Sequence, residues 1–362
     1  MKAVKALEAK HTLFDSVEEM LKPRTLSQLV QKPMADVKVI PLGDNGGVSG
    51  SRFSAVETDG GWYFLKHMSP DYDFIMTASD DARCRGVTLW QHGLLDELRP
   101  FVEHKIVGCA RDGGGRAILM EDLRESLFSD DRPFAMDHFL TFIDALARTH
   151  AAFWNDPRLA DPALGLMDTA TLVNTFSPLY AGRYAHYTTT PAPEWVTGGW
   201  QALPDLVPPE VFEHFQRLFH DPQPLVDAVA RLPHTLNHGD YRQANLAYDG
   251  STCMAFDWQL SAVSLMTVDL SWFVHQDEVL NTIGIERAIA IYRDRLETYL
   301  QRSFSESQWQ EMIDLGFCVD ALGRACFPAF FSTVDEWVED RERWIRKVQS
   351  KAQYVVNAAR WL

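Results

Sequence analysis

The residues with the clearest potential for chemistry form a short polar segment followed by an isolated aspartate. His238-Gly239-Asp240 precedes Asn245, and Asp257 ends a short apolar run twelve residues after Asn245. A carboxylate can accept or orient a hydroxyl proton, whereas a carboxamide oxygen and a second carboxylate are hard ligands that suit Mg²⁺. Phosphoryl transfer around magnesium uses these three groups. We therefore predict Asp240 as the catalytic base and Asn245 and Asp257 as metal ligands.

The same residues resemble the signature of a known superfamily. The order His-Gly-Asp-x4-Asn, then Asp257-Trp258, then Asp269-Leu270, is similar to the motifs of the aminoglycoside phosphotransferase and choline kinase superfamily. The resemblance implies a protein-kinase-like fold, ATP as co-substrate and Mg²⁺ as cofactor. In that superfamily the aspartate of His-Gly-Asp is the catalytic base, and the asparagine and the later aspartate hold magnesium. The resemblance thus implies the same three roles.

Two residues of the motif are expected to support the site. His238 resembles the superfamily histidine that braces the catalytic loop, and Asp269 resembles an aspartate that caps or anchors the C-terminal lobe. The segment between Asp257 and Asp269 is only eleven residues long, and the chain has no Ala-Pro-Glu. Protein kinases carry a longer segment there, on which peptides dock. A small-molecule acceptor is therefore expected.

The pattern of apolar residues changes near residue 123. After two short helices expected within residues 1–35, alternating apolar runs separated by Gly-rich turns predict strands at 37–42, 53–58, 62–66, 105–110 and 116–120. Beyond this point apolar residues mostly recur at helical spacing. We predict an α+β, protein-kinase-like bilobal fold. Residues 1–122 form a small antiparallel-sheet nucleotide-binding lobe, and residues 123–362 form a large, mainly helical lobe for catalysis and substrate binding.

The nucleotide half of the site is expected in the strand-rich part. Lys66 ends the strand 62–66, a position from which its side chain reaches a cleft between lobes, and the resemblance implies that it binds the ATP phosphates. The Gly-rich loop 43–50 lies between two strands before Lys66. Its backbone amides, Ser49 and Gly50 among them, are candidates to cradle phosphate. Read in isolation, Lys66 is a solvated strand-end lysine and the loop an ordinary hairpin.

One expected partner of the lysine is missing. In the superfamily a glutamate on the first N-lobe helix pairs with the lysine, but Gly86 stands at that position. Asp80 or Asp81 is a candidate substitute, although each can equally supply negative charge to a helix N-terminus. That helix is expected to begin after an N-cap at Ser79 and to end near Gly93.

The linker between the lobes is expected at residues 120–123, Met-Glu-Asp-Leu. By resemblance, the backbone around Glu121 and Leu123 pairs with adenine. The alternative is an ordinary strand end.

Composition limits the partners and the compartment. The net charge of -16 and the pI of about 5.1 argue against a nucleic-acid partner and against binding to an anionic membrane surface. No run of eighteen apolar residues and no signal-peptide core occurs, and the five scattered cysteines suit reduced thiols. We expect a cytoplasmic protein, either a monomer or a homodimer.

The acceptor is expected to bind between residues 170–220 and the C-terminal helices. Five aromatic residues and an acidic cluster at 335–342 suit an amine-bearing acceptor, although a core role and a self-paired helix face are the simpler interpretations. The aromatic residues are Tyr180, Tyr184, Tyr187, Trp195 and Trp200. Aminoglycoside-, choline-, sugar- and lipid-like alcohols stay open.

Two functional hypotheses follow. The first is a small-molecule kinase that moves the γ-phosphoryl group of ATP to a hydroxyl. The alternative, motivated by Gly86, is a nucleotide-binding pseudokinase or scaffold without turnover.

Overall fold

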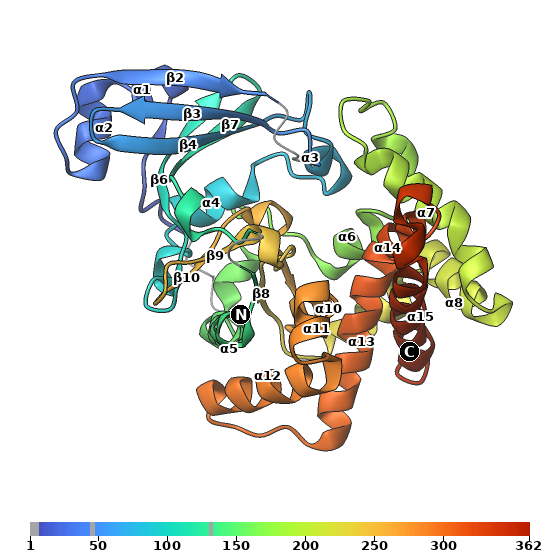
Figure 1. Ribbon diagram of the computed structural model, residues 1–362. Coiled ribbons are helices and arrows are strands. Elements are labelled where there is room, and N and C mark those ends of the chain that lie inside the picture. Colours follow the sequence, from blue (N-terminus) through green and yellow to red (C-terminus); the bar gives the residue numbers. More distant parts are fainter. Residues whose placement is uncertain (1–6, 44–47, 130–132) are drawn as a thin grey trace.

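The protein consists of a small part built on one sheet and a larger part built mainly of helices (Figure 1). The structure is a computed structural model that describes residues 7–43, 48–129 and 133–362. This is the predicted α+β arrangement. No helix in these described ranges is long and apolar enough to span a membrane.

The sheet of the small part has six strands in the order β1-β6-β7-β4-β3-β2. Only β1 runs parallel to its neighbour, and the other pairs are antiparallel, as predicted. The strands are β1 (Leu13–Phe14), β2 (Val37–Leu42), β3 (Arg52–Thr58), β4 (Gly61–Met68), β6 (Ile106–Asp112) and β7 (Gly115–Glu121).

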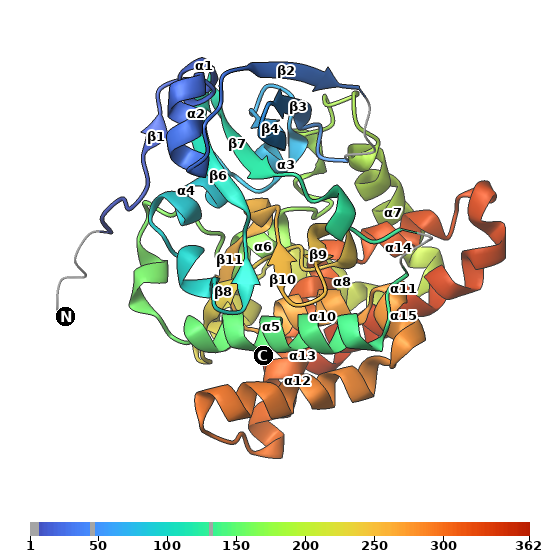
Figure 2. The same ribbon diagram turned by 60° about the vertical axis from the view of Figure 1, so that its left-hand side comes forward.

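Alternation along these strands sorts the side chains onto two faces. Val56, Leu65 and Leu119 are buried under α1 (Val17–Met20) and α2 (Pro23–Val30), the two short helices expected near the N-terminus. Figure 2 places these helices against the sheet on the side away from the helical part. Residue Lys66 lies in register with Ile118 of β7, in the middle of the sheet.

The segment between β4 and β6 departs from the prediction of one helix capped by Ser79. It contains two helices, α3 (Phe74–Ala78) and α4 (Arg85–Gln91), and Ser79 ends the first of them. The Ser79 hydroxyl donates to the Ile75 carbonyl, and Asp80 has a left-handed φ of 54°, which ends the helical path. The predicted end of the second helix near Gly93 is correct.

The large part contains the helices that surround the catalytic segment. Helix α13 runs through its centre, and every residue from Met312 to Arg324 is buried. The helices are α5 (Met136–Ala152), α6 (Thr169–Asn174), α7 (Ala192–Leu206), α8 (Pro209–His220), α9 (Gln223–Ala230), α10 (Thr267–Val274), α11 (Asp277–Thr282), α12 (Ile285–Leu300), α13 (Glu306–Arg324), α14 (Cys326–Phe331) and α15 (Arg341–Ala358).

Short strands inside the large part bring the polar motif residues together. Strand β8 (Thr235–Asn237) pairs with β11 (Ala262–Ser264). Strand β9 (Leu246–Tyr248) pairs with β10 (Cys253–Ala255), which also pairs with β5 (Val102–Glu103). The two polar loops that follow β8 and β10 are therefore held side by side.

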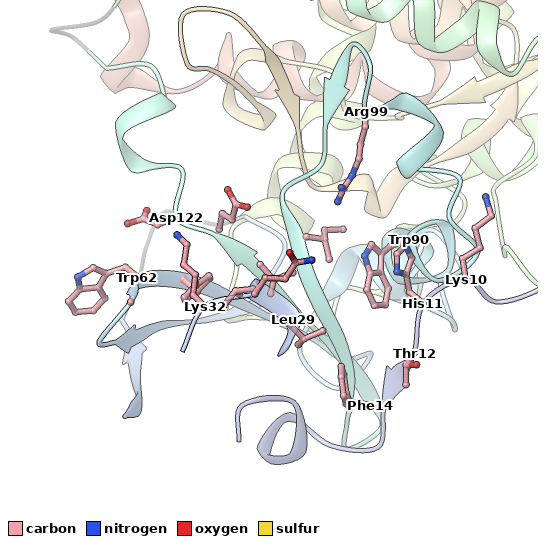
Figure 3. A pocket seen from close by; sticks show the side chains of 18 residues that line it. Lys10, His11, Thr12, Phe14, Leu29, Lys32, Trp62, Trp90, Arg99 and Asp122 are labelled. Carbon is pink, nitrogen blue, oxygen red and sulfur yellow. The ribbon is translucent and has the colours of Figure 1, made fainter. Parts of the chain in front are cut away.

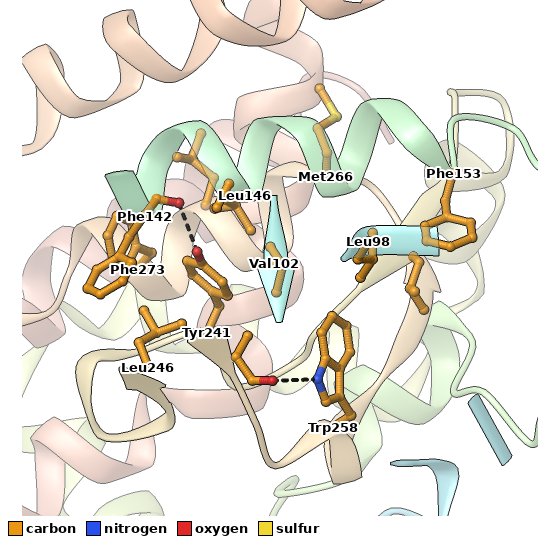
Figure 4. Packing of buried hydrophobic residues seen from close by; sticks show 14 of the residues in the cluster. Leu98, Val102, Phe142, Leu146, Phe153, Tyr241, Leu246, Trp258, Met266 and Phe273 are labelled. Atoms are coloured by element: carbon orange, nitrogen blue, oxygen red, sulfur yellow. Dashed lines mark hydrogen bonds between the residues drawn. The ribbon is translucent and has the colours of Figure 1, made fainter. Parts of the chain in front are cut away.

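The core beneath these loops joins both parts of the molecule. Tyr241 and Trp258 pack into one cluster with Phe142 and Phe273 (Figure 4). The Tyr241 hydroxyl donates to the Phe142 carbonyl (2.8 Å), and Trp258 Nε1 donates to the Ala255 carbonyl (3.1 Å). The loop backbone is thereby fixed to α5 and β10.

Candidate active site

The loop from His238 to Asn245 has a conformation that its residue types require. Gly239 has a φ of 83°, and a Cβ there would collide with the Leu260 carbonyl. His238 accepts the Asp240 N–H at Nδ1 (3.2 Å) and pairs through Nε2 with the Phe256 carbonyl (2.9 Å). A carbonyl only accepts, so Nε2 carries the proton. Burial lowers the pKa of His238, which suits this neutral tautomer.

Asp269 fixes the start of the same loop. Its two carboxylate oxygens accept the backbone N–H groups of His238 (2.6 Å) and Gly239 (2.9 Å). Asp269 lies in the first turn of α10, and its own N–H donates to the Asn237 side chain (3.3 Å). These contacts match the bracing and anchoring expected of His238 and Asp269.

The Asp240 carboxylate is surrounded by donors. Oδ2 accepts from Asn245 Nδ2 (2.8 Å), Oδ1 accepts from Trp272 Nε1 (2.8 Å), and Arg242 Nε lies 3.3 Å away. Burial acts to raise the pKa of Asp240, but the Arg242 and Arg324 guanidinium groups outweigh it and hold the pKa below its ordinary value. The group is therefore ionised and oriented.

Asn245 lies between Asp240 and the segment that carries Asp257. Its backbone carbonyl accepts the Phe256 N–H (3.1 Å), next to the pairing of Leu246 with Ala255. Asp257 has a left-handed φ of 63°, uncommon for a residue with a Cβ and often found at functional sites. The structure thus brings together the three residues singled out from the sequence.

The chemistry of these groups fits a magnesium ion that is shared with a ligand. Asn245 and Asp257 offer a carboxamide and a carboxylate. In the described part of the chain no three or more His, Cys, Asp or Glu side chains are grouped to hold a metal. Mg²⁺ commonly binds through one or two carboxylates and completes its shell with water and substrate phosphates, so this sparse donor set suits it.

Lys66 bridges the sheet to the catalytic loops. It is buried, and its Nζ lies 2.8 Å from Asp257 Oδ1 and 3.2 Å from Gln259 Oε1. The suggestion that Asp80 or Asp81 pairs with this lysine is wrong. Asp80 pairs with Arg183, and Asp81 accepts the Arg85 N–H (3.0 Å).

Gly86 lies in the first turn of α4, facing the catalytic segment. A Cβ at Gly86 would lie 3.6 Å from Trp258 Cβ and 3.8 Å from Ile118 Cδ1. Trp258 therefore packs beside this face of the helix. Only a hollow of about 20 Å³, lined by Lys66, Gly86 and Gln259 among others, remains there.

The candidate phosphate loop is described only in part. Residues 44–47 of the predicted loop lie outside the described residues. At its end, the Ser49 carbonyl accepts the Phe74 N–H (2.9 Å). Gly50 has a φ of 87°, and a Cβ there would collide with the Tyr72 carbonyl. Ser49 and Gly50 are thus fixed against the start of α3.

The predicted adenine linker follows the last strand of the sheet. The Glu121 N–H already donates to the Lys105 carbonyl (3.0 Å), and the Leu123 carbonyl accepts from Ser126 N (2.8 Å). The Glu121 N–H and the Leu123 carbonyl are therefore already bonded within the chain. The adenine role and the lobe boundary after residue 122 stay predictions.

Sequence reasoning missed a cluster of buried charges behind Asp240. Arg324 of α13 donates to the Gly239 carbonyl and to Asp320 (2.7 Å), and its guanidinium lies 4.7 Å from the centre of a Trp272 ring. Lys351 of α15 pairs with the same Asp320. The available signal was Asp320 and Arg324, two charged residues four apart in the otherwise apolar stretch from Leu315 to Arg324.

The features considered for a cationic acceptor have other roles. Tyr184, Tyr187 and Trp200 are buried in the core, and Trp200 Nε1 donates to the Phe176 carbonyl (2.5 Å). In the acidic cluster, Asp340 pairs with Arg343 (3.0 Å), and Glu342 pairs with Arg346 in the same way. The simpler interpretations are correct for these residues.

A larger hollow lies elsewhere on the molecule. It has a volume of about 820 Å³ and lies beside α2 and β6, where Lys10, Trp62, Trp90 and Arg99 line it (Figure 3). Of the predicted site residues, Glu121 alone is among its described lining residues. This hollow is therefore separate from the Asp240 loop.

Comparison with solved structures identifies the fold. An ethanolamine kinase from Plasmodium vivax superposes with a TM-score of 0.51 at 9% identity, covering 87% of this chain and 82% of that chain. A choline kinase from Streptococcus pneumoniae gives 0.49 at 14% identity, covering 92% and 100%. An aminoglycoside phosphotransferase from Streptomyces rimosus, in complex with ADP and streptomycin, gives 0.44 at 14% identity, covering 77% and 94%.

The fold is thus protein-kinase-like, as predicted. A search of curated protein sequences found no significant match. The model of the ecdysteroid kinase-like family matches residues 101–303, more than half of the chain and all of the catalytic segment. The chain belongs to the ecdysteroid kinase-like family of small-molecule phosphotransferases.

Proposed function

We propose that this protein is an ATP-dependent phosphotransferase that moves the γ-phosphoryl group of ATP to a hydroxyl of a small molecule. One observation carries the proposal. Lys66 of the sheet contacts Asp257 (2.8 Å) across 191 residues of sequence, beside the Asp240–Asn245 pair. A lysine, a candidate metal carboxylate and a candidate base lie together here, as a phosphoryl-transfer site requires.

The nucleotide is bound through backbone and lysine contacts. The Leu123 N–H and the Glu121 carbonyl pair with adenine, and the amides of Ser49 and Gly50 and the Lys66 ammonium receive the phosphates. Asn245 and Asp257 would hold Mg²⁺, which would supply positive charge against the phosphates. In support of the adenine contacts, Glu121 and Leu123 lie at the end of β7, the strand that pairs with the strand of Lys66.

In the transfer step the acceptor hydroxyl oxygen attacks the γ-phosphorus. The bond from that phosphorus to the β–γ bridging oxygen breaks, ADP leaves with the bonding electrons, and the hydroxyl proton passes to Asp240. A carboxylate is a weak base towards an alcohol. Asp240 therefore orients the hydroxyl and takes the proton late, which suits a loose transition state with little bonding to the nucleophile.

The acceptor is a small alcohol that enters beside Asp240. Three of the aromatic candidates, Tyr184, Tyr187 and Trp200, are buried in the core, and Asp340 and Glu342 pair with arginines. Neutral acceptors, including sugar-like alcohols and steroid alcohols of the kind named by the family, are therefore the first to test. Aminoglycoside- and choline-like alcohols complete the panel.

Asp240→Asn tests the activity directly. The substitution keeps the size of the side chain but removes its basicity, so transfer from γ-labelled ATP should fall about 10²- to 10⁴-fold. Binding of Mg²⁺–ATP, followed by calorimetry, should persist because the nucleotide contacts lie elsewhere. Equal transfer by wild type and variant would contradict the proposed base.

The second candidate is a pseudokinase or scaffold, which Gly86 favours because the usual acidic partner of the lysine is missing from α4. It predicts Mg²⁺–ATP binding without a phosphorylated product across the whole acceptor panel. A single detected product would exclude it.

A further inference from the structure

Lys66 pairs directly with a carboxylate that the metal would also use. Its ammonium pairs with Asp257 (2.8 Å), yet Asp257 is the candidate carboxylate for the metal. A carboxylate bound to Mg²⁺ shares its charge with the ion. The lysine then needs another acceptor to hold it in place. The superfamily uses a glutamate for this, but Gly86 stands at the position expected for that glutamate.

Gln259 is the second neighbour of the lysine, and its orientation is fixed by chemistry. Its Oε1 accepts from Lys66 Nζ (3.2 Å), and its Nε2 donates to Asp73 Oδ2 (3.0 Å). An ammonium can only donate and an ionised carboxylate can only accept. The amide therefore has one orientation that satisfies both partners, and it connects Asp73 to Lys66.

Asp73 is fully buried, and all its described partners are donors. Besides Gln259, it accepts from Ser51 Oγ (2.5 Å) and from the backbone N–H groups of Ile75 (3.0 Å) and Met76 (3.3 Å) at the start of α3. Burial raises the pKa of Asp73, and Lys66 is the strongest influence against that rise. The buried carboxylate and the buried ammonium thus stabilise each other through the amide.

Asp73 is also joined to the candidate phosphate loop. Ser51 follows that loop directly and donates to the carboxylate, while the Ser49 carbonyl accepts from the Phe74 N–H (2.9 Å). One side chain thereby links the loop that faces the phosphates to the lysine that would bind them.

We propose that Asp73, acting through the side-chain amide of Gln259, replaces the missing helix glutamate as the positioning residue for Lys66 in the nucleotide site. The inference rests on the proposed function, since it assumes that Lys66 binds ATP phosphates. It explains why a chain with Gly86 on α4 retains a buried, oriented lysine.

Asp73→Asn removes the negative charge at this position but keeps the size and shape of the side chain. The new amide can still accept from the Ile75 and Met76 N–H groups, so the cap of α3 is retained. Its NH₂ group would face Nε2 of Gln259, which must then turn and present its own NH₂ to the Lys66 ammonium. The Kd for Mg²⁺–AMP-PNP, measured by calorimetry on the full chain, should rise about tenfold or more.

Gln259→Glu in the Asp73→Asn background supplies the rescue. The introduced carboxylate pairs with Lys66 directly and accepts from the new amide at position 73, so the Kd should return to within about threefold of wild type. In the wild-type background the same Gln259→Glu change sets two carboxylates against each other and should weaken binding. If Gln259→Glu weakens binding in the wild-type background but restores it in the Asp73→Asn background, binding depends on the charges at these two positions. Loss of the helix cap would not produce this reversal.

Asp168→Asn is the matched control, because Asp168 caps α6 by accepting the Thr171 N–H (2.8 Å) away from the site. It should leave the Kd unchanged, and thermal unfolding midpoints show that each variant is folded. The inference is overturned if Asp73→Asn binds Mg²⁺–AMP-PNP like wild type, or if the double variant binds no better than Asp73→Asn. AMP-PNP is not turned over, so a chain that shows this pattern but phosphorylates no acceptor would refute the proposed activity alone.

Discussion

The two halves of the candidate site differ in their balance of charge. On the nucleotide side one cation, Lys66, faces two carboxylates, Asp73 and Asp257. On the side of the catalytic loop three cations accompany three carboxylates, Asp240, Asp269 and Asp320. Those cations are Arg242, Arg324 and Lys351.

The difference matches what each half would receive. The nucleotide half has an excess carboxylate, which a divalent cation can neutralise. In the catalytic half the charges balance, and the Arg242 and Arg324 guanidinium groups act on Asp240, close to where the negative phosphoryl group would pass.

Breaking the buried cluster of the catalytic half should have the largest effect. Asp320→Asn leaves Lys351 and Arg324 buried without their shared carboxylate, so the free energy of unfolding in urea should fall by about 3–5 kcal/mol. Asp80→Asn breaks an exposed ion pair with Arg183 and should cost less than about 1 kcal/mol. Equal losses in the two variants would show that the cluster is not buried as described.

Removing the cation of the nucleotide half should lower catalysis strongly. Lys66→Met leaves Asp73 and Asp257 without positive charge, and kcat/KM for ATP should fall about 100-fold, roughly 2.7 kcal/mol. Lys38→Met in the same sheet removes an exposed lysine paired with Glu57 (3.5 Å) and should leave the kinetics unchanged. Steady-state assays over a range of ATP concentrations decide between these outcomes.

A smaller effect is expected from Trp272, which contacts both Asp240 and Arg324 in the catalytic half. Trp272→Phe keeps an aromatic ring for Arg324 but loses the N–H that donates to Asp240 (2.8 Å). A hydrogen bond to a charged group contributes about 1.5–3 kcal/mol, so kcat should fall about tenfold with KM for ATP unchanged. Trp361→Phe loses a similar bond to Asp314 (2.8 Å), remote from the loop, and should retain the wild-type kcat.

Acid should lower the free energy of unfolding through His275, a buried histidine of the catalytic half that stays neutral in the folded chain. Burial lowers the pKa of His275 to about 3, and the Lys351 ammonium adds to this effect. Between about pH 6.5 and 3 only the unfolded state binds this proton, so stability declines as the pH falls through that window.

His275→Gln measures the size of that decline. Urea unfolding between pH 7.5 and 5 should show a pH slope reduced by up to about 1.4 kcal/mol per pH unit. Exposed His220→Gln is the matched substitution and should keep the wild-type slope. An unaltered slope in His275→Gln would argue against a buried neutral imidazole.

Local sequence patterns predicted the fold class and the residues of the catalytic loop. Asp240 and Asn245 lie in one short segment, and alternating apolar runs marked the strand that carries Lys66. Asp73 and Gln259 could not be found in this way, because 186 residues separate them. Proximity in sequence also misled the search for a partner of the lysine, since Asp80 and Asp81 lie near Gly86 but contact arginines.

The position of Lys351 has a consequence for synthesis of the protein. A nascent chain that has emerged as far as α14 already contains the sheet, the catalytic loop and Asp320, but not the lysine that pairs with it. Until α15 leaves the ribosome, the Asp320 carboxylate lacks half of its neutralising charge. We therefore expect the central helix α13 to dock stably only once α15 has been synthesised.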